Sequence, residues 1–278
     1  MKDDFANLET EKVGRKIKKN SDPVAYLVQN FIEEHDEINS ILKKNNKNIT
    51  KAIDKFTSTF SAGGSIYFIG AGTSGRLGVL EAAECPPTFG TSPNKIIALM
   101  AGGNSAVFKS KEGAEDSSVN SQKDLKNKKF SKNDLLIGIS ASGTSEYVLS
   151  GIKFAKKLKA KTILISCNHL KNKVSDLDLE LNVGSEFVAE STRLKSVTIT
   201  KNVLNIIIDI VPSTKKLRAR SIRNLSLLLH INEKLAGSLL NDSKWSIRVA
   251  VIIFKMKLPY QKAKSLSKKI SIVELLDA

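Results

Sequence analysis

Five short apolar runs alternate with segments of helical spacing, and this alternation limits the fold of the chain more than any other feature. The runs span residues 65–69, 95–100, 134–140, 161–167 and 177–183. Runs of this length are typical of strands buried on both faces of a sheet, and helical segments between them make neighbouring strands parallel. The sequence therefore predicts an α/β fold in which helices cover both faces of a parallel sheet.

Apolar residues also recur at helical spacing before and between the predicted strands. Residues 23–60 follow this spacing, and the glycine pair at 63–64 ends it. The same spacing returns over residues 77–83, 106–115, 118–126, 146–158 and 191–208. We expect a helix in each of these segments.

The last quarter of the chain is strongly basic. Of the formal net charge of +16, residues 215–278 contribute +10, from fourteen basic and four acidic side chains, so the other 214 residues contribute +6. Apolar runs at 225–229, 249–254 and 270–276 predict short amphipathic helices in this tail. We therefore divide the chain into an N-terminal helical region, 1–52, a central α/β domain, 53–214, and a small basic helical region, 215–278.

A net charge of this size raises nucleic acid, an anionic membrane or an anionic metabolite as partners. The basic tail has few aromatic side chains (Trp245, Phe254 and Tyr260) and no RNP-like or helix-turn-helix motif. We therefore interpret its lysines as solvated helix faces and expect no nucleic-acid partner. No membrane partner is expected either, because the most apolar segment, 203–211, is far shorter than the roughly 20 residues that span a bilayer.

Cysteine and histidine are too scarce to form a disulfide framework or a structural metal site. The two cysteines, Cys85 and Cys167, form no Cys-x-x-Cys pair, and the three histidines lie far apart in the sequence. We expect no disulfide, no metal and no cofactor. Residues 1–12 are acidic and polar, unlike a secretion signal, so a cytoplasmic location is expected.

The first predicted strand leads into the glycine-rich loop 70–76, which reads GAGTSGR. This is formally a G-x-G-x-x-G motif between a strand and a helix, so a dinucleotide site has to be considered. Such a site needs an acidic residue at the end of the second strand, where this sequence has AGG at 101–103. The hydroxyls of Thr73 and Ser74 and the cation of Arg76 instead suit a phosphate at a helix N-terminus. The alternative is a tight turn without a ligand.

A second small, hydroxyl-rich loop follows the third predicted strand. It covers residues 140–145 and reads SASGTS. Because the carboxyl ends of parallel strands meet at one edge of a sheet, both loops are expected to border one cleft, which suits a phosphorylated polyol. The predicted contacts to phosphate and sugar hydroxyls are Thr73, Ser74, Ser140, Ser142 and Thr144.

Two such loops in this order resemble the sugar isomerase (SIS) domain, the phosphosugar-binding fold of sugar-phosphate isomerases and regulators. The run from 69 to 90, IGAGTSGRLGVLEAAECPPTFG, narrows the resemblance to the N-acetylmuramic acid 6-phosphate etherase family. Further segments similar to that family are LETE at 8–11, AGG at 101–103, EGAEDS at 112–117, ISCN at 165–168, STRLK at 191–195, KLRARSIR at 216–223 and INEKLA at 231–236. The glucokinase regulatory protein is a non-enzymatic relative with a similar loop, so the fold alone does not imply activity.

The resemblance implies an SIS-type three-layer sandwich and a homodimer that acts on a small phosphosugar without metal or nucleotide. Enzymes of the family remove D-lactate from carbon 3 of N-acetylmuramic acid 6-phosphate, by elimination and then addition of water, and leave N-acetylglucosamine 6-phosphate. The resemblance places the acid/base pair at Glu84, as proton donor, and at Glu115, as its partner. Each also has a structural interpretation, Glu84 as a surface residue at a helix end and Glu115 as part of a solvated acidic face.

The chain departs from the family pattern at several positions. Thr144–Glu146 stand where the family usually has Arg-Thr-Pro, Ser185 replaces proline, Glu190 replaces glycine, Val197 and Ile199 replace small residues, and the segment near Ile206–Asp209 is shortened. These departures leave both glutamates in place. They keep open a second hypothesis, a phosphosugar-binding regulator without turnover, and an aldose–ketose isomerase is a weaker alternative.

Overall fold

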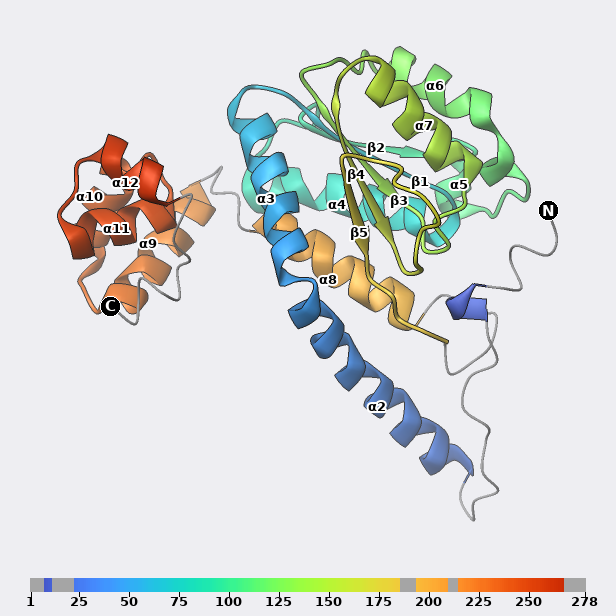
Figure 1. The fold of residues 1–278 in the computed structure, drawn as a ribbon, viewed down its shortest axis with the longest axis horizontal. Coiled ribbons are helices and arrows are strands. Elements are labelled where there is room, and N and C mark those ends of the chain that lie inside the picture. Colours follow the sequence, from blue (N-terminus) through green and yellow to red (C-terminus); the bar gives the residue numbers. More distant parts are fainter. Residues whose placement is uncertain (1–7, 12–22, 186–193, 210–214, 268–278) are drawn as a thin grey trace. The chain divides into compact units, whose positions relative to one another are not determined.

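The computed structural model describes residues 8–11, 23–185, 194–209 and 215–267, and a five-stranded sheet lies at its centre (Figure 1). The strands are β1 (Ile66–Gly70), β2 (Ile96–Met100), β3 (Leu135–Ile139), β4 (Lys161–Ser166) and β5 (Leu177–Glu180). Their order is β2-β1-β3-β4-β5, and every pairing is parallel. The predicted parallel α/β sheet is confirmed. Four apolar runs match the strands to within one residue at each end, and the fifth strand ends three residues early, at Glu180.

Contacts within the chain divide it into two compact units, one built around the sheet and one that contains the last helices. The elements around the sheet are the 3-10 turns η1 (Glu9–Glu11) and η2 (Ala114–Asp116) and the helices α2 (Pro23–Lys44), α3 (Asn46–Ser61), α4 (Gly72–Phe89), α5 (Ser105–Phe108), α6 (Ser118–Asn127), α7 (Glu146–Lys157) and α8 (Lys195–Asp209). The last helices are α9 (Lys215–Leu229), α10 (Glu233–Asp242), α11 (Ile247–Met256) and α12 (Tyr260–Leu266).

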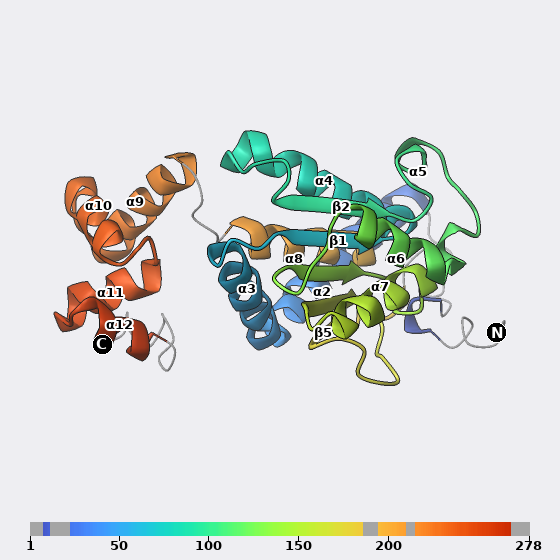
Figure 2. The ribbon, with the colours of Figure 1, turned by 90° about the horizontal axis from the view of Figure 1, so that it is seen from above.

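Helices cover both faces of the sheet (Figure 2). Successive side chains of each strand point to opposite faces, so the apolar strands pack against helices on both sides. On one face Tyr67 and Ile69 join a buried apolar cluster with α6 and α7. On the other face Phe68 lies under α4, where a Cβ added to Gly78 would approach Phe68 Cβ to 2.9 Å. This close approach explains the glycine in the middle of the helix. Helices α3 and α8 pack together, and the Lys201 ammonium of α8 donates to the Glu81 carboxylate of α4. The result is the predicted three-layer sandwich.

The predicted helical region 23–60 consists of two helices, α2 and α3, with Asn45 between them. Helix α2 packs against α8. There the buried Lys195 ammonium of α8 lies 3.3 Å from the Glu37 carboxylate and 3.5 Å from that of Glu34. Ile199, which stands where the family has a small residue, is also fully buried in α8. The larger side chain at position 199 is therefore packed inside the molecule, whereas Val197 is only partly buried. Glu190 lies outside the described residues.

The prediction of one continuous helix over residues 106–115 is wrong. Helix α5 ends at Phe108, Lys109 is extended, and only η2, from Ala114, resumes a helical turn. Gly113 breaks the pattern because its φ of +69° lies in the left-handed region, which glycine adopts without steric cost. The apolar spacing of this segment therefore belongs to a loop that returns to the core at Ala114.

The second unit has its own apolar core, formed by residues of all four of its helices. The apolar runs predicted at 225–229 and 249–254 lie in α9 and α11, whereas the run at 270–276 lies outside the described residues. Helices α10 and α12 were not predicted, because they are short and only weakly apolar. Ser246 caps α11 by accepting a hydrogen bond from the Val249 amide at 3.4 Å. Across the described ranges, no helix is both long enough and apolar enough to cross a membrane.

Candidate active site

Three loops that follow neighbouring strands meet at the carboxyl edge of the sheet. Ala71 and the first turn of α4 follow β1, the segment 101–117 with α5 and η2 follows β2, and loop 140–145 follows β3. Strands β2 and β3 lie on opposite sides of β1. The chain thus reverses its strand order at β1, and in open parallel sheets ligands bind in the crevice at such a point.

Two close glycines let α4 begin directly at the end of β1. A Cβ on Gly70 would lie 2.7 Å from the Gly75 amide nitrogen, and a Cβ on Gly75 would lie 2.8 Å from the Gly70 carbonyl oxygen. Helix α4 therefore starts at Gly72, five residues earlier than the apolar spacing predicted. As a result, the half-buried Thr73 and Ser74 stand in its first turn, where backbone N–H groups have no intrahelical partner.

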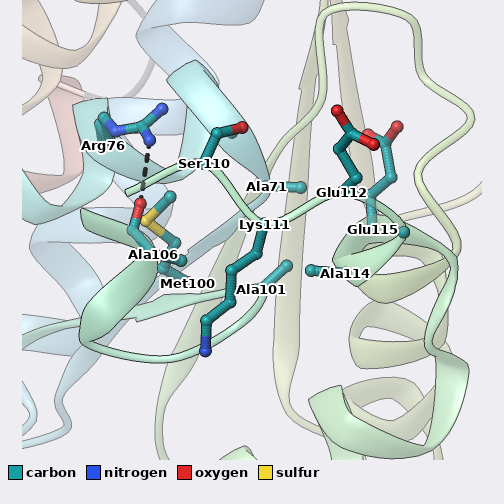
Figure 3. Close-up of a pocket in the computed structure, with 12 residues that line it drawn as sticks. Ala71, Arg76, Met100, Ala101, Ala106, Ser110, Lys111, Glu112, Ala114 and Glu115 are labelled. Carbon is teal, nitrogen blue, oxygen red and sulfur yellow. Dashed lines mark hydrogen bonds between the residues drawn. The ribbon is translucent and has the colours of Figure 1, made fainter. Parts of the chain in front are cut away.

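The Arg76 guanidinium is bound to the backbone of the next loop. Its Nε donates to the Val107 carbonyl and its Nη2 to the Ala106 carbonyl, both at 2.9 Å. Figure 3 shows the contact with Ala106. These two donors are therefore not available to the phosphate for which the sequence suggested Arg76. Instead they tie the start of α4 to the end of α5.

A pocket lies between the start of α4 and the loop after β2. Its lining comes from residues 71–76, between β1 and the first turns of α4, and from residues 100–115, which begin at the end of β2: Ala71, Gly72, Arg76, Met100, Ala101, Ala106, Ser110, Lys111, Glu112, Gly113, Ala114 and Glu115. Figure 3 shows the carboxylates of Glu112 and Glu115 pointing the same way from this loop. The structure thus places the predicted acid/base residue Glu115 at a pocket, together with a second carboxylate, Glu112, to which the sequence assigned no role.

The second loop brings its predicted hydroxyls together. The Ser142 hydroxyl oxygen accepts hydrogen bonds from the Thr144 hydroxyl at 2.8 Å and from the Thr144 amide at 3.2 Å, and it lies 3.5 Å from the Ser140 hydroxyl. Gly143 turns the loop with a φ of +76°. The turn η2, which carries Glu115, packs against α7, the helix that follows this loop. The pocket and the second loop are therefore neighbours.

Ser145 is a further candidate, which the sequence alone did not indicate. It immediately precedes α7, its side chain is only 9% exposed, and its hydroxyl has no hydrogen-bond partner among the residues that the structure describes. A buried hydroxyl without a protein partner is uncommon, so Ser145 is a candidate for a ligand contact. The available signal was its position, since a serine just before a helix lies beside that helix's free N–H groups.

Glu84 does not line the pocket. It is exposed on α4, twelve residues after Gly72, which corresponds to about 18 Å along the helix axis. Because α4 runs back along the sheet from the carboxyl edge (Figure 2), Glu84 lies toward the opposite edge. The structure therefore does not bring Glu84 and Glu115 together within one chain.

Two further motifs of the sequence meet beside the second loop. The Asn168 side chain accepts a hydrogen bond from the Thr10 amide at 3.2 Å and donates to the Thr10 hydroxyl and to the Ala141 carbonyl, both at 3.0 Å. Asn168 belongs to the ISCN segment and Thr10 to the LETE segment. The N-terminal segment is thus tied to the loop that carries Ser140 and Ser142, across 158 residues of sequence.

A buried tyrosine of α7 joins this helix to its neighbour α6. The Tyr147 hydroxyl donates to the Asp124 carboxylate of α6 at 2.7 Å. Burial, and then this hydrogen bond to a carboxylate, raise the pKa of Tyr147 well above its ordinary value. In the portion of the chain that is described, no three His, Cys, Asp or Glu side chains cluster as metal ligands would.

Comparison with known proteins finds one matching domain family and similar proteins in several bacteria. The model of the glucokinase regulatory protein N-terminal SIS domain matches residues 48–156. An N-acetylmuramic acid 6-phosphate etherase of Prochlorococcus marinus is 42% identical and covers 89% of this chain and 86% of its own length. The etherase of Vibrio campbellii is 36% identical, with coverages of 87% and 85%. That of Staphylococcus epidermidis is 42% identical, with coverages of 74% and 76%.

Proposed function

This chain belongs to the N-acetylmuramic acid 6-phosphate etherase family, and we propose that it has the activity for which its relatives are named. It cleaves the D-lactyl ether of N-acetylmuramic acid 6-phosphate and releases D-lactate and N-acetylglucosamine 6-phosphate. The observation that carries the proposal is the similarity over 89% of the chain to a relative that is 42% identical.

The phosphate binds at the N-terminus of α7. Ser140, Ser142 and Thr144 form a compact group of hydroxyls there, and the partnerless Ser145 hydroxyl lies beside them. The first N–H groups of the helix and its dipole add to the attraction for an anion. Thr73 and Ser74, in the first turn of α4, contact the sugar from the other side of the crevice.

The reaction needs one group that removes the proton from carbon 2 and another that protonates the departing lactyl oxygen. The proton on carbon 2 is acidified by the aldehyde of the open sugar, and water then adds to the unsaturated intermediate. Glu115, at the pocket, is one of the two acid/base groups, and Glu84 is the proton donor.

The distance along α4 between Glu84 and the pocket supports a shared site. In a homodimer, which we propose as the working form, Glu84 of a second copy completes the pocket that holds Glu115. The site uses no metal or nucleotide. A phosphorylated sugar does not cross a membrane unaided, so we place the protein in the cytoplasm, in recycling of cell-wall amino sugars.

The experiment that tests this function is incubation of the purified protein with N-acetylmuramic acid 6-phosphate and an assay for D-lactate. Enzyme activity predicts stoichiometric D-lactate and N-acetylglucosamine 6-phosphate, and loss of both products in Glu115→Gln. Binding of the sugar phosphate without release of D-lactate would instead identify a regulator. That competing hypothesis stays open because Glu146 places a negative charge beside the proposed phosphate loop.

A further inference from the structure

The end of α5 leaves backbone carbonyls that the helix itself does not use. Helix α5 is a single turn, and the last carbonyls of any helix have no partner further along it. The Arg76 guanidinium fills this gap by donating to two consecutive carbonyls, those of Ala106 and Val107. A planar guanidinium suits such a contact, because its donors are fixed in one fork.

The segment beyond this contact has few other supports. Ala106 is buried and Ala114 packs against the core, but residues 108–113 between them are exposed, with Phe108 89% exposed. The other side-chain support that the structure describes is the Lys111 ammonium, which donates to the Gly102 carbonyl at 2.8 Å. Glu115 lies two residues beyond this exposed stretch, after Ala114.

We propose that Arg76 is a positioning residue that fixes the loop carrying Glu115 and does not bind the phosphate of the substrate. The inference rests on the proposed function, since it assigns Arg76 to the placement of that reaction's acid/base group. An acid/base group displaced by about 1 Å can lose on the order of 100-fold in rate. Arg76 therefore affects turnover through Glu115, and it affects affinity for the phosphosugar little.

The test compares Arg76→Lys with Arg76→Gln in the full-length protein. Lysine keeps the positive charge but replaces the two-pronged donor by a single ammonium. We expect both variants to lose 10- to 100-fold in kcat, with KM for N-acetylmuramic acid 6-phosphate within threefold of wild type. A direct phosphate contact predicts the opposite split, a KM raised tenfold or more in Arg76→Gln and largely restored by lysine, and that result would overturn the proposal.

The matched control is Lys95→Gln. The Lys95 ammonium also donates to two consecutive carbonyls, those of Gly63 and Gly64, but at the start of β2, at the opposite edge of the sheet. We expect this variant to keep wild-type kcat and KM. An equal loss of kcat in Lys95→Gln would mean that removing any contact between a basic side chain and two backbone carbonyls impairs the enzyme. That result would contradict a specific positioning role for Arg76.

Two measurements keep the inference separate from the proposed activity. Amide hydrogen exchange of residues 107–115 is expected to accelerate in both Arg76 variants whether or not the wild type releases lactate, and unchanged exchange contradicts the proposal. In the wild type, the Arg76 Nε–H resonance is expected to stay in place on saturation with N-acetylglucosamine 6-phosphate. A large change in the chemical shift of this resonance would indicate direct contact between Arg76 and the phosphosugar. This measurement uses only the wild-type protein, so it does not depend on whether a variant folds. Absence of lactate from the wild type would refute only the activity.

Discussion

Two buried serines of the α7 region differ in their hydrogen-bond partners, and this difference supports Ser145 as a proposed phosphate contact. The Ser150 hydroxyl donates to the Ser118 carbonyl at 2.7 Å and accepts from the Gln122 amide at 3.1 Å. The Ser145 hydroxyl has no partner in the described part of the chain. Ser150 therefore serves packing between helices, whereas Ser145 is available to a ligand oxygen.

Ser145→Ala is predicted to raise KM for N-acetylmuramic acid 6-phosphate roughly tenfold, because one hydrogen bond to a charged oxygen contributes about 1.5 kcal/mol or more. Its melting temperature should stay near wild type, since no protein hydrogen bond is lost. Steady-state kinetics and thermal unfolding measure the two effects. Ser150→Ala is the control, with unchanged KM and about 1 kcal/mol less stability. A KM that rises equally in both variants contradicts the assignment.

At the scale of the elements, α6 and α7 are joined by the buried contact between Tyr147 and Asp124. Folding raises the pKa of the tyrosine, so the folded state holds its proton more tightly than the unfolded state. The contribution of this contact to stability is complete below the ordinary tyrosine pKa near 10 and is lost as the pH rises above that value.

Tyr147→Phe is predicted to lower the free energy of unfolding by about 1.5 kcal/mol at pH 7. Urea unfolding at pH 7, 9 and 10.5 is the measurement, and the gap between wild type and variant should narrow above pH 10. Asp124→Asn, which keeps an acceptor but removes the charge, should retain more stability than Tyr147→Phe. A gap that widens with pH would mean that the tyrosine is not held neutral by folding.

The first turn of α7, where we propose that the substrate phosphate binds, carries the negative charge of Glu146. Glu146 is exposed at this helix N-terminus, a position at which an acidic side chain favours the helix but repels an incoming phosphate. Stability and substrate affinity are therefore opposed at this residue.

Glu146→Gln is predicted to lower KM about threefold at low ionic strength, and less at high salt because the charge is exposed. The same change should reduce stability by about 0.5 kcal/mol through the helix dipole. Glu233→Gln, at the corresponding turn of α10 in the second unit, is the control, with a similar stability loss and no change in KM. An unchanged KM in Glu146→Gln at low salt would remove this residue from the phosphate site.

For the whole molecule, the separation of Glu84 from the pocket has a direct consequence. If each active site uses Glu84 of one copy and Glu115 of the other, a heterodimer of two single variants contains one intact site and one doubly altered site.

Mixing Glu84→Gln with Glu115→Gln, each inactive alone, is therefore predicted to restore about a quarter of wild-type lactate release after subunit exchange. The assay is lactate release from the mixture after mild denaturation and refolding. The double variant Glu84→Gln/Glu115→Gln mixed with wild type is the control for successful exchange. No recovery in an exchanged mixture would place both glutamates in one chain's site or remove one of them from the reaction.

Local patterns were sufficient to predict the strands and most of the helices around the sheet. The strands follow from apolar runs and the crossover helices from helical spacing, since both depend on neighbouring residues. The helix predicted over 106–115 failed because its apolar residues return to the core through a loop with a left-handed glycine rather than along a helix face. Spacing alone does not distinguish these two routes.

The sequence by itself determined the parallel α/β architecture, the two small-residue loops and the family of the chain, because these depend on the order of residue types. Only the tertiary structure decided which groups meet. It directed the Arg76 donors to carbonyls thirty residues away, left the Ser145 hydroxyl buried without a described partner, tied Thr10 to Asn168, and separated Glu84 from Glu115. Such partners depend on how distant segments pack, and the direction of a side chain in the folded molecule is not contained in its local pattern.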